Sequence, residues 1–225
     1  MANKSNGAID KAYQYLYGGI LSGELPLGSP ISEMEISAAL KISRSPIREA
    51  LRRMETEGLV HRYPGHGTFV TNITQKDLED IFELRIMFEL QALHTAYKYF
   101  DNEYLDALER DFMYLNPDSQ PQQYYDANTR LHTGIIAYAG NERMEKFYKQ
   151  LLAQMAIVNR ISARDPEHFV LSREKHLAIV QAIKQRDLEK AEQYLRAHLE
   201  EVRDRTIKGY GEPIVSEKYT PHSTL

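Results

Sequence analysis

The chain has 225 residues with 42% hydrophobic and 27% charged residues, which are ordinary globular values and exclude a wholly disordered chain. It contains no cysteine, so disulfides and thiolate metal sites are excluded, and the composition is compatible with a reducing cytoplasm. The apolar runs are far shorter than the roughly 20 residues of a membrane-spanning helix, and the N-terminus has no signal-peptide pattern. We therefore expect a cytoplasmic protein without membrane contact.

The net charge of −4 is unevenly distributed along the chain. Residues 1–75 carry eight Lys/Arg and seven Asp/Glu, a balance of +1, and residues 76–225 carry the other −5. Within residues 41–53 five cations stand against one acid, Glu49. Such a cluster is either a solvated helix face or a footprint for phosphate.

The N-terminal segment is predicted to form three short helices. Apolar residues at helical spacing predict a helix over residues 8–21, which ends at the breaker-rich segment SGELPLGSP. Ser32, followed by Glu35, has the spacing of a capping box and predicts a second helix. Ser43 is expected to cap a third helix that ends at Gly58.

Strand-like runs at residues 59–63 and 68–70 flank the turn-forming sequence PGHG and predict a hairpin. Helix, helix, turn, helix, hairpin is the order of a winged helix-turn-helix domain. The stretch LKISRSPIREALRRMETEGLVHRYPGHGTFV, with the preceding Gly-x-Leu-x-x-Gly pattern at residues 23–28, resembles the DNA-binding domain of the GntR family. The resemblance covers residues 8–72 and implies a DNA-binding transcriptional regulator.

From residue 74 onward the pattern predicts amphipathic helices at about 75–98, 101–115, 121–139, 141–163, 171–185 and 187–208. Six helices after a winged domain resemble the FCD effector domain of the FadR subfamily, in its shorter, VanR-like branch. The expected fold is mainly α, a winged helix-turn-helix followed by an all-α six-helix antiparallel bundle. The expected domains are a DNA-binding domain at 1–73, an effector-binding and dimerisation domain at 74–208, and a flexible tail at 209–225.

The third helix is the predicted recognition helix. Arg44 and Arg48 are four residues apart on one face, and arginine pairs bidentately with guanine in the major groove. Ser43 and Ser45 lie at the helix N-terminus, where a phosphate is favoured, and Arg52 is expected to contact either the DNA backbone or a neighbouring acid. At the hairpin tip, His66 and Gly67 are predicted to reach the minor groove. The resemblance assigns base contact to Arg44 and Arg48 and wing contact to His66 and Gly67.

Three histidines occupy positions where apolar residues are expected. His132, His176 and His198 lie on the predicted inward faces of three different helices, and Asn128 precedes His132 by one turn. A single buried histidine is usually hydrogen-bonded within the core, but three converging imidazoles with an oxygen donor are typical of a divalent metal site.

The resemblance sharpens this hypothesis, because many FCD domains bind metal through an Asp-x-x-x-His pair and two later histidines. Here Asn128 stands in place of the aspartate, so metal binding is expected to be weaker, and metal-free ligand binding is the alternative. Zinc, nickel and manganese all suit such ligands. The family's effectors are commonly small carboxylic acids, and Arg85 and Arg160 are the candidate carboxylate anchors. For Arg85 the alternative is a salt bridge with Glu89, and Arg160 is alternatively a surface residue.

These observations predict a regulator that binds a palindromic double-stranded operator as a homodimer and responds to a small organic acid. Repression relieved by ligand is the commoner arrangement in the family. One alternative is a metal-dependent enzyme, although the predicted ligand faces offer no nearby carboxylate and no HExxH pattern. The other is an architectural DNA-binding protein whose helical domain only dimerises.

Overall fold

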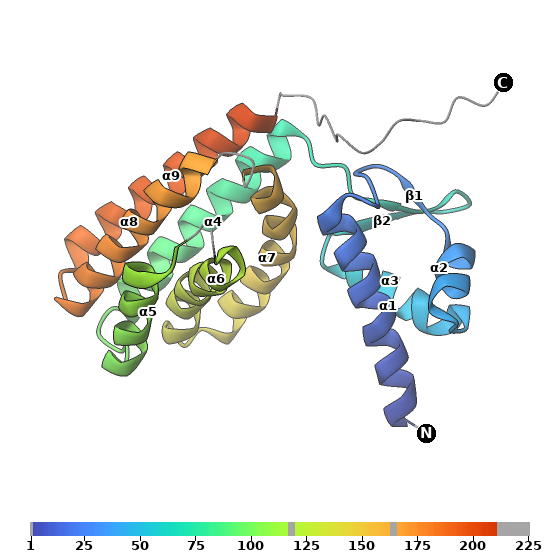
Figure 1. The fold of residues 1–225 in the computed structure, drawn as a ribbon, viewed down its shortest axis with the longest axis horizontal. Coiled ribbons are helices and arrows are strands. Elements are labelled where there is room, and N and C mark those ends of the chain that lie inside the picture. The colour runs from blue at the N-terminus through green and yellow to red at the C-terminus, as the bar shows by residue number, and fades with distance from the viewer. Residues whose placement is uncertain (1, 117–119, 163–165, 211–225) are drawn as a thin grey trace.

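The computed structural model describes residues 2–116, 120–162 and 166–210, with side chains described outside residues 2–6, 121–122, 156–162 and 166–171. Its described residues form nine helices and a three-stranded sheet. Two parts lie side by side, a small one that holds the sheet and a larger one built from helices alone (Figure 1). The mainly helical fold agrees with the sequence prediction.

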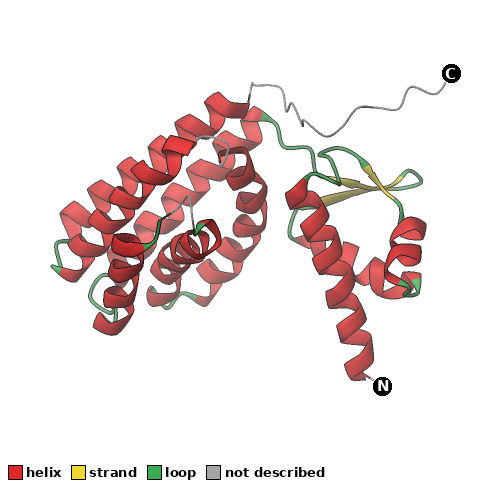
Figure 2. Ribbon diagram, in the orientation of Figure 1, coloured by secondary structure: helices red, strands yellow, loops and turns green. Residues whose placement is uncertain are grey.

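The small part is a winged helix. It contains α1 (Ala2–Ser22), β1 (Pro30–Ile31), α2 (Glu33–Leu40), α3 (Arg44–Thr56), β2 (Val60–Tyr63) and β3 (Gly67–Val70). The strands are antiparallel in the order β1-β3-β2, and the sheet flanks the three helices (Figure 2). The short strand β1 was not predicted, because it lies in the glycine- and proline-rich segment that marks the end of α1.

Local sequence explains why α2 and α3 begin where they do. The Ser32 side chain accepts a hydrogen bond from the Glu35 amide at 3.2 Å, as the capping-box spacing predicted. Ser43 occupies the N-cap position of α3, but its side chain makes no capping hydrogen bond, contrary to the prediction. The inward face of α3 includes Ile47 and Met54, which are fully buried and belong to the same core as Leu16 and Ile20 of α1.

The larger part consists of α4 (Gln75–Ala96), α5 (Asn102–Tyr114), α6 (Pro121–Tyr138), α7 (Glu142–Ser162), α8 (Pro166–Lys184) and α9 (Leu188–Tyr210). Helix α8 begins five residues before its predicted start at 171. Of the predicted tail, residues 211–225 lie outside the described residues. Helix α4 is central, because it packs against α6, α7 and α9.

The two parts are joined by the segment between β3 and α4. A capping box at Thr74 and Asp77 starts α4, and the Tyr210 hydroxyl at the end of α9 donates a hydrogen bond to the Ile73 carbonyl. Helix α7 also contacts α1. Among the described residues, no helix is long and apolar enough to cross a membrane.

Candidate DNA interface and candidate metal centre

The N-terminal end of α3 presents the predicted recognition residues to solvent. Ser43, Arg44 and Ser45 are all exposed, while the apolar face of α3 is buried in the core. Because the Ser43 hydroxyl is not used as a cap, it remains available at the positive end of the helix dipole. The arrangement fits a phosphate contact beside the side chains that are predicted to read bases.

Two of the predicted contacts are ion-paired within the chain. Nε of Arg48 lies 2.8 Å from Oε2 of Glu33 on α2, and Arg52 pairs with Glu49 at 2.6 Å. The two arginine side chains are 57% and 63% exposed, so these are surface pairs worth little. Phosphate or guanine can therefore replace the carboxylates at small cost.

The wing adds His66 and Gly67, which are both exposed at the turn between β2 and β3. Arg62 of β2 is also exposed and lines the same shallow depression as Arg48 and Arg52. The sequence analysis did not single out Arg62, since a lone cation in a strand carries no motif. Its position next to the recognition helix makes it a further candidate for phosphate contact.

In the helical part, the three predicted histidines converge in the core. His132 on α6, His176 on α8 and His198 on α9 are 1–3% exposed, and one ring nitrogen of each lies within 4.8 Å of the others. Nε2 of His176 lies 3.0 Å from Nε2 of His198. The sequence thus correctly placed three separate helices around one polar centre.

A buried carboxylate holds His132. Oε2 of Glu89, on α4, lies 2.6 Å from Nδ1 of His132, and Oε1 accepts hydrogen bonds from Nε of Arg85 at 2.7 Å and from the Tyr148 hydroxyl at 2.6 Å. Glu89 is fully buried, and burial alone would raise its pKa. The contacts with His132, Arg85 and Tyr148 outweigh this and lower the pKa of Glu89 to about 2, so the carboxylate is ionised.

The same contact fixes the tautomer of His132. Burial lowers the pKa of His132, which favours the neutral ring, and an ionised carboxylate at Nδ1 requires the proton on Nδ1. Nε2 then carries a lone pair directed away from Glu89. This atom is buried and has no hydrogen-bond partner among the described residues.

A tyrosine holds the second histidine. The Tyr124 hydroxyl lies 3.2 Å from Nδ1 of His176, and burial raises the pKa of Tyr124, so this hydroxyl stays protonated. When Nδ1–H of His176 donates to the Tyr124 oxygen, Nε2 is left as a ligand atom. Outer-shell partners of this kind orient metal-binding imidazoles in many proteins.

These residues fit a divalent ion. One ring nitrogen of each histidine lies within 4.8 Å of the others, and the Nε2 atoms of His176 and His198 lie at hydrogen-bond distance, so one ion could contact all three imidazoles. The buried lone pair on His132 is costly in an apolar core, and a bound cation would satisfy it. The donor set is therefore suited to zinc, nickel or another imidazole-binding metal.

The remaining predicted site residues have the following positions. Asn128 is half-buried on α6, one turn before His132. Arg85 is buried and paired with Glu89, which is the arrangement of the salt-bridge alternative. Arg160 belongs to α7, but its side chain lies outside the part of the chain whose side chains are described. The assignments of Asn128, Arg85 and Arg160 to metal or effector stay predictions.

The role of Glu89 and the participation of Tyr148 were not predicted from the sequence. The expectation that the predicted ligand faces have no carboxylate nearby was wrong, since Glu89 contacts His132 from the neighbouring helix α4. The carboxylate is fully engaged by three donors and acts as a support for His132. The available signal was a charged pair, Arg85 and Glu89, on an otherwise apolar helix face.

A basic recognition helix with a wing, joined to a helical domain with a buried histidine centre, defines a transcriptional regulator with a separate sensor domain. Comparison with known proteins agrees. Residues 8–70 match the family described as bacterial regulatory proteins, gntR family, and residues 80–201 match the FCD domain. The chain therefore belongs to the GntR family of transcriptional regulators and carries an FCD domain.

Similar proteins are regulators and not enzymes. The chain is 25% identical to the gluconate operon transcriptional repressor of Bacillus subtilis over 216 residues, which cover 90% of this chain and 86% of the repressor. Its fold is similar to E. coli McbR/YncC, with a TM-score of 0.75, 19% identity and coverage of 90% and 98% of the two chains. The zinc-bound FCD domain of TM0439 matches with a TM-score of 0.56 at 24% identity, covering 62% of this chain and 97% of that domain.

Proposed function

We propose that the chain is a repressor whose DNA binding responds to occupancy of a divalent metal site in the helical domain and to a small carboxylic acid held at that metal. The observation that carries this proposal is the convergence of three buried imidazoles, one of which keeps a buried lone pair that no described residue meets with a hydrogen bond. A regulator does not need such a costly group for folding alone, since an apolar side chain would fill the space more cheaply.

On the DNA side, the proposal assigns the contacts to α3 and the wing. Arg44 and Arg48 read base edges, while Ser43, Ser45 and Arg52 hold phosphates, and His66 and Gly67 enter the minor groove. Their exposure supports these roles. A homodimer would place two such surfaces on a palindromic operator, one in each half-site. Because a bacterial DNA-binding regulator must reach its DNA, we infer that the protein acts in the cytoplasm.

On the sensor side, His132, His176 and His198 would hold the metal, with Asn128 as a candidate oxygen ligand. When bound, a divalent ion supplies open coordination positions that favour an anionic oxygen ligand. The chain's own residues favour an anion as well: the histidines are neutral ligands, and Arg85 balances the charge of Glu89. The zinc-bound relative supports zinc as the first metal to test.

Arg85 and Arg160 are proposed as anchors for the effector's carboxylate. Nε of Arg85 donates a hydrogen bond to Oε1 of Glu89, and the two terminal nitrogens of its guanidinium carry further N–H donors. Effector binding regulates the protein only if the ligand binds the DNA-competent and DNA-free states with different affinity. The gluconate operon transcriptional repressor among its relatives supports repression.

Metal content tests the proposal directly. The purified, untagged protein is compared with a His132→Ala/His176→Ala variant and with His94→Ala, whose histidine is exposed on α4. We expect about one divalent ion per chain in the wild type and in His94→Ala, and loss of the ion in the double variant. Absence of metal from the wild type after incubation with zinc would refute a metal-based sensor.

A further inference from the structure

The surface between the winged helix and the helical part points to a route by which the sensor acts on DNA binding. Helix α7 is the bundle helix that faces the winged part, and it lies next to α1 (Figure 1). We propose that α7 transmits the state of the histidine centre to the end of the recognition helix. This inference rests on the proposed function, since it names how the same site is regulated.

One face of α7 belongs to the histidine centre. Tyr148 is 2% exposed and donates its hydroxyl to Oε1 of Glu89 at 2.6 Å, and the other oxygen of Glu89 holds Nδ1 of His132. Only one carboxylate therefore separates α7 from a candidate metal ligand. A shift of His132 on ligand binding must be accommodated by Glu89 and, through it, by Tyr148.

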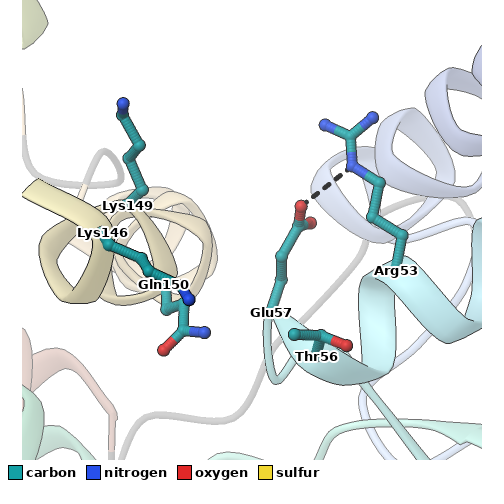
Figure 3. Close-up of a pocket in the computed structure, with 6 residues that line it drawn as sticks. All are labelled: Arg53, Thr56, Glu57, Lys146, Lys149 and Gln150. Carbon is teal, nitrogen blue, oxygen red and sulfur yellow. Dashed lines mark hydrogen bonds and ion pairs between the residues drawn. The ribbon is translucent and has the colours of Figure 1, made fainter.

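The other face of α7 meets the end of the recognition helix. Gln150 and Tyr148 are two positions apart in the sequence and so project roughly 160° apart around the helix axis. Lys146, Lys149 and Gln150 line one side of a cleft whose other side is formed by Arg53, Thr56 and Glu57 of α3 and its C-cap (Figure 3). The cleft has a volume of about 310 Å³.

Next to this cleft the two parts touch. Gly58 lies just after the C-cap of α3 with φ of +74°, a conformation that suits glycine, and one residue separates it from β2. A Cβ added at Gly58 would collide with Nε2 of Gln154, so the amide of Gln154 covers this turn. Motion of α7 therefore pushes or releases the turn that connects the recognition helix to the wing.

The charges across the cleft offer the Glu57 carboxylate two sets of partners. Glu57 is held on its own side by Arg53 at 3.0 Å and by the Tyr13 hydroxyl at 2.5 Å, and it lies across the cleft from Lys146 and Lys149. Closing the cleft would bring these lysines toward the Glu57 carboxylate, and opening it leaves the carboxylate with its local partners. The cleft thus provides both the room and an electrostatic reason for a small rigid-body shift.

The absence of native cysteines allows a direct test. Cysteines introduced as Thr56→Cys/Gln150→Cys stand on opposite walls of the cleft, and the rate of linking by a short bismaleimide reports its width. The matched control, Lys146→Cys/Gln150→Cys, keeps the second cysteine and places both on α7. Linking is measured without DNA, with and without saturating zinc, and bound zinc is quantified in every sample.

We expect zinc to change the rate of linking across the cleft by about threefold or more and to leave the rate of the control variant unchanged. When Tyr148→Phe is added to the cross-cleft variant and the protein still binds zinc, we expect zinc to have no effect on the linking rate. Equal cross-cleft rates in zinc-loaded and zinc-free protein would overturn the inference. So would an undiminished zinc effect in the Tyr148→Phe background.

DNA affinity separates this inference from the proposed function. After linking with the short reagent, zinc should change DNA affinity by less than about twofold, whereas the unlinked protein keeps the response of the wild type. If zinc does not change the DNA affinity of the unlinked protein, the proposed function is refuted. A linking rate that still depends on zinc in that same protein would support coupling through α7. A linked protein that responds to zinc like the unlinked one overturns the inference alone.

Discussion

Replacing Glu89 with glutamine is the most informative single perturbation of the sensor core. The change keeps the shape of the side chain and removes the charge that Arg85, His132 and Tyr148 share. Arg85 would be left as a buried, uncompensated cation, which costs about 3–5 kcal/mol. Each of the three hydrogen bonds to the Glu89 carboxylate contributes about 1.5–3 kcal/mol, and the side-chain oxygen of the introduced glutamine would keep part of this contribution. We expect a loss of about 3–5 kcal/mol in the free energy of unfolding.

Urea unfolding followed by far-ultraviolet circular dichroism measures this loss. Glu83→Gln is the matched control, because Glu83 lies on the same helix and is exposed. The control should change stability by less than about 0.5 kcal/mol. If Glu89→Gln lowers the free energy of unfolding no more than Glu83→Gln does, the charge of Glu89 does not stabilise this core.

The double variant Arg85→Met/Glu89→Gln tests the reason for the loss. Removing the cation as well should recover at least about 1 kcal/mol relative to Glu89→Gln, because no unpaired charge stays buried. Additive losses from the two changes would refute the explanation even if the single variant is unstable.

Three further outcomes follow from the same geometry. Arg48→Ala should weaken binding to a duplex selected from a random pool by about 1–3 kcal/mol and relax specificity at one base, and an unchanged isotherm in fluorescence anisotropy would remove Arg48 from the interface. Tyr124→Phe should lower zinc affinity by about tenfold or more in a competition titration, because Nδ1 of His176 loses its partner; wild-type affinity would exclude a supporting role. Saturating zinc should raise the melting temperature of the wild type and not that of His176→Ala, and an equal rise in both would place the bound zinc elsewhere.

Much of the fold follows from local sequence signals. The capping spacing at Ser32, the glycine after α3 and the hairpin turn around His66 each specify local geometry, and the winged domain was predicted from them. The helical part was predicted from apolar periodicity, which shows which face of a helix is buried more reliably than it shows where the helix begins and ends. The start of α8 was therefore placed five residues too late, and β1 was missed because its pairing with β3 is a tertiary contact.

Only part of the sensor site could be predicted from the sequence. His132, His176 and His198 stood out because an imidazole at an apolar position requires a partner. Glu89 and Tyr148 could not be assigned, since their importance depends on how α4 and α7 pack against α6. Helical periodicity shows that a residue faces inward, but it does not show which side chain from another helix it meets.

The domain junction was beyond sequence reasoning as well. Gln154 and Gly58 are 96 positions apart, and the signal that Gly58 carries, the end of a helix, is local. Their contact depends on how the winged part is placed against α7, which no local pattern encodes.

The most direct test of the account is DNA affinity measured by fluorescence anisotropy on the selected duplex, with zinc-loaded and zinc-free protein. Wild-type affinity should differ between the two forms by about fivefold or more, and the His132→Ala/His176→Ala variant should bind equally in both. If the wild type binds the duplex with the same affinity whether or not zinc is bound, the histidine centre does not control DNA binding, and the account is contradicted.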